Sequence, residues 1–443
     1  MLKSDPALPF LEMAWSKKEM IAFFDRDVLP VVHPGRRVVG LKRERMAYSA
    51  GRKCVALYTL HLDGPHSEVS HRAVVTFARD GWLEEAGVDL TRANGSARSA
   101  LHVPAYGCLV EFFPNDWQLP GLRHGADAVE VAHCLASTAP DKRATTSARV
   151  EVDIIRYRPH ETCVLRYRVD AEDGEPPRDV IGKLYRDSAK AEHVWAAMRA
   201  LYSQGANARA LIPRPLGLKP EWNLVLMECA PGVSMKRVLV EAGSDEARRA
   251  AKQAAAAVAS YHTLELQSDD VRTVQTELAK LEKRAARLRC VAPAFSVVVD
   301  DFLKQVESRA ATLGDAPPSF IHGDCKPNQL LLDGDHVAIV DFDRSCVGDP
   351  AIDVGNFMSQ FPKFALSTGH DHLRELAPYF LAEYQARARR PGLEERARLF
   401  QALSLARMAV RKLENSPQTY ARGGVSSPQV ALLEEAKACL AEL

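Results

Sequence analysis

The residues best suited to chemistry lie in one stretch, "FIHGDCKPNQLLLDGDHVAIVDFD", which runs from Phe320 to Asp343. It contains a His-Gly-Asp triplet that ends at Asp324 and an Asp-Phe-Asp triplet that begins at Asp341. One carboxylate can accept a proton from a hydroxyl group, and another can hold Mg²⁺ beside phosphate oxygens. Two such groups in one site are what phosphoryl transfer needs.

The elements that would position these carboxylates are two apolar runs, "QLLL" and "VAIV", joined by a Gly-Asp turn. This pattern predicts an antiparallel hairpin, which returns the chain to its start and brings Asp324 and Asp341 together. Gly323 permits the backbone torsions that would turn Asp324 into a cleft. The alternative is that each acidic triplet only satisfies backbone donors in a turn. Two triplets flanking one hairpin favour the catalytic interpretation.

The chain from about residue 150 onward resembles the aminoglycoside phosphotransferase and choline kinase family. The resemblance rests on His322-Gly323-Asp324, on Asp341-Phe342-Asp343 and on the "GDPAIDVGNF" that follows. It implies an α+β, bilobal protein-kinase-like fold with a β-rich small lobe and a helical large lobe. It also implies ATP and Mg²⁺ as cofactors.

The same resemblance implies roles for four residues of this stretch. Asp324 resembles the catalytic Asp that accepts or orients the substrate hydroxyl, and Asp341 resembles the principal Mg²⁺ ligand. The family's second metal ligand is an Asn five residues after the catalytic Asp, where this chain has Gln329. Asn328 stands one residue early, so either amide oxygen could bind the metal.

Lys183 is the candidate cation for the nucleotide phosphates. It lies in the middle of the strand-like "DVIGKLYRD", where a lysine is otherwise a poor choice. In the family such a lysine pairs with a Glu of the next helix, and Glu192 is the candidate here. The alternative is that Glu192 is a solvated surface residue.

The rest of the nucleotide site is expected in two segments. No glycine-rich loop lies between the first two strands after residue 150, so Thr162 and the backbone of the turn before it are the expected phosphate contacts. The apolar strand "NLVLMECAPG" resembles the hinge between the lobes, where the backbone of three residues would bond the adenine edge: Glu228, Cys229 and Ala230.

The first 145 residues form a separate region. "YSAGRKCVALY", from Tyr48, matches "YRPHETCVLRY", from Tyr157, at the same offsets, and Thr76 stands where the second copy has Lys183. Either two hairpins are alike by chance or a β-unit is duplicated. We therefore expect a β-rich N-terminal cap or degenerate small-lobe copy at 1–145, loosely like the cap of maltokinases, ahead of a small lobe at 150–230 and a helical large lobe at 231–443.

Composition limits the partners. Lys plus Arg number 58 and Asp plus Glu 57, so no whole-protein field favours nucleic acid or a membrane. The nine cysteines have no metal-ligand spacing, which is typical of a reducing compartment. No apolar run is long enough for a signal peptide or a membrane span. We expect a soluble cytoplasmic protein that acts on a small-molecule hydroxyl acceptor. One expected role of the N-terminal cap is to form a homodimer.

These features predict a phosphotransferase that acts on a hydroxyl of a small molecule such as an aminoglycoside, a sugar or an amino alcohol. The many arginines of the C-terminal helices give no support for a polycationic acceptor. One alternative is a nucleotide-binding scaffold, or pseudokinase, which the missing glycine-rich loop and Gln329 would favour. A second is nucleotidyl transfer on the same fold.

Overall fold

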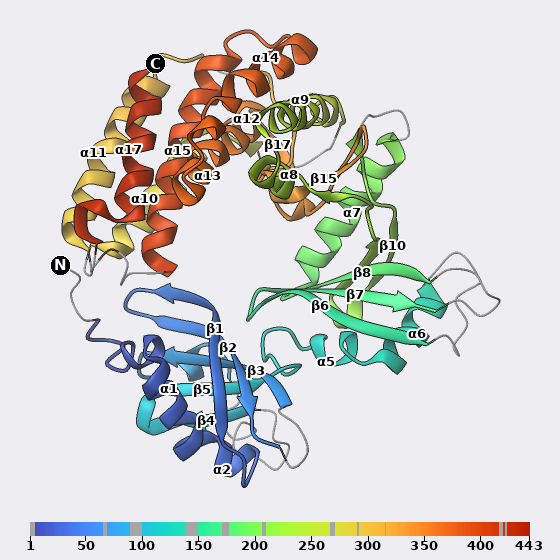
Figure 1. Cartoon of the computed structure of the whole chain (residues 1–443), viewed down its shortest axis with the longest axis vertical. Coiled ribbons are helices and arrows are strands. Elements are labelled where there is room, and N and C mark those ends of the chain that lie inside the picture. The colour runs from blue at the N-terminus through green and yellow to red at the C-terminus, as the bar shows by residue number, and fades with distance from the viewer. Residues whose placement is uncertain are drawn as a thin grey trace.

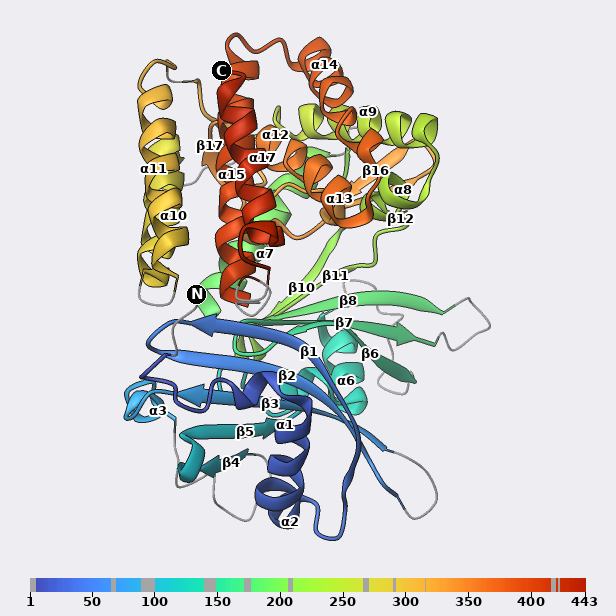
Figure 2. The same cartoon turned by 60° about the vertical axis from the view of Figure 1, so that its left-hand side comes forward.

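The computed structural model describes residues 5–64, 69–88, 100–138, 149–170, 177–205, 210–265, 271–289, 292–314, 316–415, 420 and 423–443. The chain forms an N-terminal β-rich region, a second sheet and a helical part, which follow one another through the molecule (Figures 1 and 2). The predicted α+β class, with a β-rich small lobe, a helical large lobe and an extra β-rich region before them, is confirmed.

The N-terminal sheet is antiparallel with strand order β1-β2-β3-β5-β4. Its strands are β1 (Val38–Ser49), β2 (Lys53–Leu62), β3 (Val69–Ala78), β4 (Ala100–Val103) and β5 (Cys108–Phe112). One face packs against α1 (Lys17–Phe23) and α2 (Leu29–Val32) in a core of its own, and α3 (Trp82–Glu85) follows β3. Successive side chains of β2 and β3 point to opposite faces of the sheet, and most of them are buried on both faces, so each face carries an apolar set.

The second sheet has strand order β10-β11-β8-β7-β6. Its strands are β6 (Val150–Arg158), β7 (Thr162–Val169), β8 (Arg178–Tyr185), β10 (Pro215–Lys219) and β11 (Leu224–Glu228). Helix α7 (Ser188–Gly205) connects β8 to the rest of the lobe. Two helices that precede the sheet, α5 (Leu122–Gly125) and α6 (Ala128–Thr138), contact it. They lie before residue 145 in the chain but share an apolar core with both sheets.

The two sheets have the same topology. In each, three antiparallel strands run in chain order, the fifth pairs with the third, and the fourth lies at the edge. Tyr48 pairs with Cys54 in the first hairpin, as Tyr157 pairs with Cys163 in the second. Duplication of a β-unit stays a prediction, and the shared strand order supports it. Turn and breaker residues predict a linker at 137–149, and most of it lies outside the described ranges.

The large lobe is mainly helical. Its helices are α8 (Met235–Glu241), α9 (Ser244–Tyr261), α10 (Val274–Leu288), α11 (Pro293–Ala310), α12 (Ala351–Met358), α13 (Gln360–Thr368), α14 (Leu376–Ala388), α15 (Leu393–Asn415) and α17 (Pro428–Ala441). The Ala-rich sequence of α9 has high helix propensity, and a Thr273–Thr276 capping box begins α10. These helices bury a single large apolar core.

Two small sheets carry the chemistry-bearing loops of this lobe. The first has strand order β12-β15-β16-β9, and its strands are β12 (Val233–Ser234), β15 (Leu330–Asp333), β16 (His336–Ile339) and β9 (Ala210–Leu211). The second has order β13-β17-β14, with β13 (Val271–Arg272), β17 (Cys346–Gly348) and β14 (Ser319–Ile321). The predicted hairpin after Asp324 is β15–β16.

The N-terminal region also reaches the large lobe, because β1 contacts α15. None of the helices in the described ranges is long and apolar enough to cross a membrane.

Candidate active site

The loop that carries Asp324 is held by a buried carboxylate. Asp353, on α12, accepts hydrogen bonds from the backbone N–H of His322 at 2.6 Å and of Gly323 at 2.9 Å. The Tyr261 hydroxyl donates to the same carboxylate at 2.6 Å. Gly323 has φ +73°, and a Cβ there would lie 2.2 Å from the Arg344 carbonyl oxygen, so only glycine fits. The bend before Asp324 is therefore fixed by packing and by Asp353.

The side chain of Gln329 lies between the two predicted carboxylates. Its Nε2 donates to Asp324 Oδ2 at 3.1 Å and to Asp341 Oδ2 at 3.2 Å. Hairpin β15–β16 separates Asp324 from Asp341 in the chain and brings them back together. His322 Nε2 lies 3.0 Å from the carbonyl oxygen of Val340, which ties the first loop to the second. The two acidic turns thus face one point.

Lys183 reaches the same point from the small lobe. Its Nζ donates to Asp341 Oδ1 at 2.5 Å and to Asp343 Oδ1 at 2.6 Å. The Tyr185 hydroxyl donates to the same Asp343 oxygen at 2.8 Å. Lys183, Asp341, Gln329 and Asp324 therefore form a continuous chain of hydrogen bonds across the two lobes. Two distant carboxylates and one strand-borne ammonium converge there, as the sequence predicted.

The expected pair between Lys183 and Glu192 is not formed. Glu192 is exposed on α7, and the ion-pair partners of Lys183 are Asp341 and Asp343. The α7 residue that reaches the site is Lys190, whose Nζ donates to the Asp343 carbonyl. Successive helix residues are turned by about 100°, so Glu192 points well away from the direction of Lys190. The packing of its apolar face sets this orientation of α7. Lys190, and not Glu192, is therefore the α7 residue at the site.

A cleft of about 290 Å³ between the lobes contains the other expected nucleotide residues. Thr162 lines it beside the β6–β7 turn, and Glu228, Cys229 and Ala230 line it where β11 leaves the small lobe. The Glu228 side chain pairs with Arg214 at 2.8 Å, which leaves backbone groups to meet a ligand. Six apolar side chains on the small-lobe strands and α7 also line the cleft: Ile155, Val164, Ile181, Val194, Met198 and Met227. An apolar slot with a few polar groups is typical of a nucleobase site.

Sequence reasoning missed three cations of this cleft. Arg156 and Arg158 line it from β6, and Lys326 lines it from the catalytic loop. Lys326 Nζ donates to Asp324 Oδ2 at 2.5 Å. Arg158 Nε is buried without a hydrogen-bond partner among the described residues. The available signal was the strand alternation around Tyr157, which places both arginines on one face.

The two central carboxyls are held ionised. Burial works to raise the pKa of Asp324, but Lys326 and Arg344 outweigh it and hold that pKa below its usual range. The pKa of Asp341 is likewise lowered, because Lys183 outweighs the effect of burial. Both groups therefore remain anionic at neutral pH and can meet a metal ion or a hydroxyl proton.

The donor set fits a magnesium ion. Asp341 and Gln329 offer a carboxylate and an amide oxygen, the ligands that Mg²⁺ prefers. Gln329 is buried, and within the described ranges its Oε1 has no hydrogen-bond partner. Asn328 lines the same cleft but is exposed, and it makes no bridge between the carboxylates. Between the two amides that the sequence left open, the geometry favours Gln329.

Removing these amides one at a time distinguishes them. We expect Gln329→Ala to weaken Mg²⁺-dependent nucleotide binding about 10-fold or more, in the range seen when groups that support a metal are lost. Asn328→Ala should change it less than about twofold, because an exposed amide is replaced by solvent. Titration calorimetry of ATP at several Mg²⁺ concentrations measures both. Equal, negligible effects would contradict the assignment of either amide.

Comparisons with known proteins agree with this geometry. The model of the phosphotransferase enzyme family matches residues 160–407, which is more than half of the chain. The match begins after the N-terminal region, so the likeness of residues 1–145 to maltokinase caps stays a prediction. A search of curated proteins finds no match.

Several solved structures are similar to this chain at low identity. The GDP complex of an aminoglycoside 2′-phosphotransferase is 16% identical over 70% of this chain and 98% of its own, with a TM-score of 0.48. A choline/ethanolamine kinase family protein from Mesorhizobium loti is 14% identical over 70% and 94%, with a TM-score of 0.44. A macrolide 2′-phosphotransferase from Brachybacterium faecium is 18% identical over 71% and 97%, with a TM-score of 0.42.

With TM-scores below 0.5, these likenesses carry no argument, and the family rests on the match to residues 160–407. That match spans β7, β8, β11 and the Asp324 and Asp341 loops. The chain belongs to the phosphotransferase enzyme family.

Proposed function

We propose that this enzyme transfers the γ-phosphoryl group of ATP, with Mg²⁺, to a hydroxyl group of a small molecule. The observation that carries the proposal is the chain of contacts from Lys183 through Asp341 and Gln329 to Asp324. These contacts join a phosphate-binding cation, a set of metal ligands and a carboxylate that can accept the proton of a hydroxyl group, all at the mouth of one cleft.

Each residue has a distinct task in that reaction. The nucleobase enters the apolar part of the cleft, and Lys183 and Arg158 bind phosphate oxygens. Asp341 and Gln329 would hold Mg²⁺, which supplies positive charge across the phosphates. Asp324 orients the acceptor hydroxyl and takes its proton as the new O–P bond forms and the bond to the β-phosphate oxygen breaks. Because the pKa of Asp324 is lowered, it is a weak base, so orientation contributes more than early deprotonation.

The charges beside Asp324 bear on the acceptor. Burial and the neighbouring cations Lys326 and Lys236 lower the pKa of Lys363, on α13, to about 8. Burial, Arg284 and Arg158 lower the pKa of Arg411, on α15, which also feels the charge of Asp324. A gathering of cations repels a polycationic aminoglycoside and accommodates a neutral or acidic hydroxyl compound. We propose the second kind of acceptor.

The experiment is a turnover assay with ATP, Mg²⁺ and a panel of hydroxyl compounds. The panel contains aminoglycosides, amino alcohols, neutral sugars and sugar acids. We expect acceptor-dependent release of ADP, with at least about 10-fold higher kcat/KM for the best neutral or acidic acceptor than for any aminoglycoside, a difference of about 1.4 kcal/mol. An aminoglycoside as the best acceptor would refute the proposed acceptor class and leave the phosphotransferase proposal standing.

The same assay separates the alternatives. A protein that binds ATP but releases no ADP with any acceptor is a nucleotide-binding scaffold. A product that gains AMP rather than phosphate, as mass spectrometry would show, identifies nucleotidyl transfer. Homodimer formation through the N-terminal region stays a prediction, which light scattering of the full chain would check.

A further inference from the structure

The β6–β7 turn, residues 159–161, lies between two residues that line the cleft, Arg158 and Thr162, and it contains no glycine. His160 in this turn has φ +64°, a conformation that non-glycine residues rarely adopt. Such a conformation persists only where surrounding contacts hold it. The contacts that hold this turn come from the N-terminal region.

Asp116 binds the turn at two places. Its Oδ2 accepts the Tyr157 hydroxyl at 2.9 Å and the backbone N–H of His160 at 2.8 Å. Its Oδ1 accepts the backbone N–H of Gln118 at 2.9 Å, which fixes the carboxylate itself. One side chain thus bonds both the end of β6 and the residue with the unusual φ.

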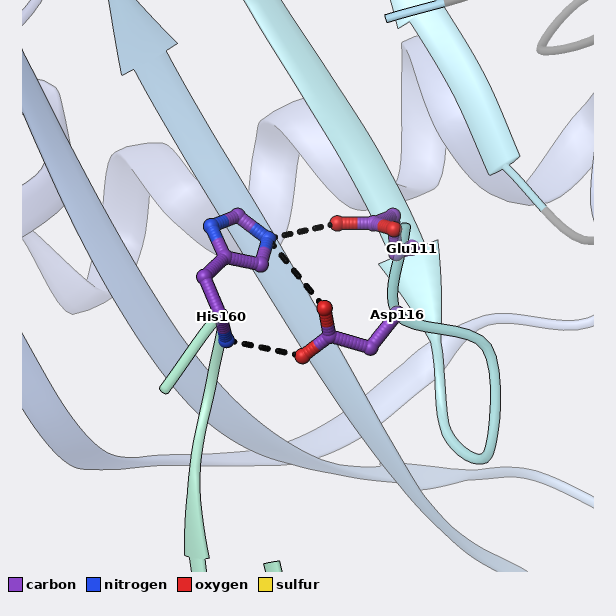
Figure 3. A group of neighbouring side chains, drawn as sticks. All are labelled: Glu111, Asp116 and His160. Atoms are coloured by element: carbon purple, nitrogen blue, oxygen red, sulfur yellow. Dashed lines mark hydrogen bonds and ion pairs between the residues drawn. The ribbon is translucent and has the colours of Figure 1, made fainter. Parts of the chain in front are cut away.

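Glu111, on β5, binds the His160 side chain (Figure 3). Its Oε2 lies 2.8 Å from His160 Nε2, so the two side chains form a hydrogen bond. Its Oε1 accepts the backbone N–H of Trp117 at 2.7 Å. The relative exposures of Glu111, Asp116 and His160 are 1%, 5% and 4%, so water does not compete for these bonds. We call Glu111, Asp116, Tyr157 and His160 the turn anchor.

Strand alternation connects the turn anchor to the nucleotide cleft. Tyr157 points away from the cleft toward Asp116, and its neighbours Arg156 and Arg158 line the cleft on the other face. Holding Tyr157 and His160 therefore fixes Arg158, which stands between them. Arg158 lines the cleft, and its Nε has no hydrogen-bond partner among the described residues.

The first β-unit contains the same arrangement. Asp5 Oδ2 accepts the Tyr48 hydroxyl at 2.7 Å and the backbone N–H of Gly51 at 2.8 Å, and Gly51 has φ +68°. There the residue with positive φ is glycine, and its turn does not line the nucleotide cleft. In the second unit His160 replaces that glycine and adds a bond to Glu111. The additional bond lies at the turn that meets the nucleotide.

We propose that Glu111 and Asp116 of the N-terminal region are positioning residues for ATP: they hold the β6–β7 turn so that Arg158 and Thr162 meet the phosphates. In this enzyme the turn anchor takes the place of a glycine-rich loop. The inference rests on the proposed function, because it concerns the same nucleotide site.

A metal ion is the other reading of this cluster, since one ligand atom from each of Glu111, Asp116 and His160 lies within 4.8 Å of the others. Hydrogen bonds account for the geometry more fully. All four carboxylate oxygens already accept a donor, and the 2.8 Å contact is an ordinary hydrogen-bond length. A bound metal is therefore an outcome of the test.

The test compares two matched Tyr→Phe variants of the full chain. Tyr157→Phe removes one bond of the turn anchor, and Tyr48→Phe removes the equivalent bond of the first unit. We expect Tyr157→Phe to raise the Kd for Mg²⁺-ATP about 10-fold, the loss of one buried hydrogen bond to a carboxylate. Tyr48→Phe should change the Kd less than about twofold. It should lower Tm about as much as Tyr157→Phe does, since both variants lose a buried hydrogen bond.

A second pair of proteins tests the route through Arg158. In an Arg158→Ala background, Tyr157→Phe should weaken ATP binding no further, because the two effects share one contact. In turnover assays Tyr157→Phe should raise KM for ATP and leave KM for the acceptor unchanged. Asp116→Asn keeps the shape of the side chain and loses one hydrogen-bond acceptor. It should have the same effects on ATP binding and on the two KM values as Tyr157→Phe.

Three results would overturn the inference. Equal effects of Tyr157→Phe and Tyr48→Phe on ATP binding would make the turn anchor a purely structural feature. Independent, additive effects of Tyr157→Phe and Arg158→Ala on ATP binding would show that Tyr157 does not act through Arg158. A stoichiometric metal in the purified protein that Asp116→Asn abolishes would replace the hydrogen-bonded anchor by a metal site. Failure of the unmodified protein to bind ATP would refute the proposed function, and this inference with it.

Discussion

Replacing Asp324 by Asn is expected to lower phosphoryl transfer about 10³-fold, within the range for loss of a positioned acid–base group, and to leave ATP binding nearly unchanged. Asn keeps the shape of the side chain and can still contact Gln329. It cannot take the hydroxyl proton, and it lacks the negative charge that pairs with Lys326. A loss of this size corresponds to about 4 kcal/mol of transition-state stabilisation.

Single-turnover transfer with the best acceptor measures the chemical step, and calorimetry measures ATP binding. Asp333→Asn is the matched control, because Asp333 is an exposed Asp at the tip of the neighbouring hairpin. A variant that retains more than a tenth of the activity would assign the hydroxyl to another group.

The unmodified enzyme should also show a particular pH dependence. Because the pKa of Asp324 is held below its usual range, this carboxyl stays ionised as the pH falls from 7 to 5. Its contribution to folding stability is present above the pKa of the unfolded chain and is lost only as the pH falls through the lower folded value. A loss of activity between pH 7 and 5 would therefore arise from another group.

Replacing Asp341 by Ala is expected to weaken Mg²⁺-ATP binding about 100-fold or more, because it removes the group that both metal and Lys183 approach. The present contact of Lys183 Nζ with Asp341 Oδ1 is 2.5 Å. After the change Lys183 retains Asp343, so its buried ammonium is not left without a partner. The loss should thus appear in metal-dependent binding more than in folding.

Binding of ATP with Mg²⁺ and with a chelator separates these contributions. Asp341→Ala should remove most of the gain that Mg²⁺ gives, whereas ATP binding without metal should change less than about threefold. Asp343→Asn is the control, because it alters the other partner of Lys183 and keeps Asp341. If Asp343→Asn removed the metal dependence and Asp341→Ala did not, Asp343 rather than Asp341 would be the metal ligand.

Much of the site could be predicted because its central parts are close in sequence. Asp324, Gln329 and Asp341 are joined by one short hairpin, and hairpin geometry follows from apolar runs and a turn. Lys183 stood out because a charged residue is unusual in the middle of an apolar strand. In each case a local pattern was sufficient.

The errors and omissions have a common physical cause. Glu192 is the expected partner of Lys183 because the family pairs such a lysine with a Glu of the next helix, but α7 packs so that Lys190 reaches the site instead. Arg156 and Arg158 look like ordinary surface charges of an edge strand until the cleft is seen on their side. The choice between Gln329 and Asn328 depended on which side chain the short turn after Lys326 buries.

The sequence by itself determined the elements and the acidic hairpin, because strand and helix periodicity and turn residues act over a few neighbours. Only the tertiary structure decided which side chains meet across the lobes. Asp116 lies 41 residues before Tyr157 in the chain, and their 2.9 Å contact depends on how two similar sheets pack together. Such contacts depend on the packing of whole sheets and helices, which no local pattern specifies.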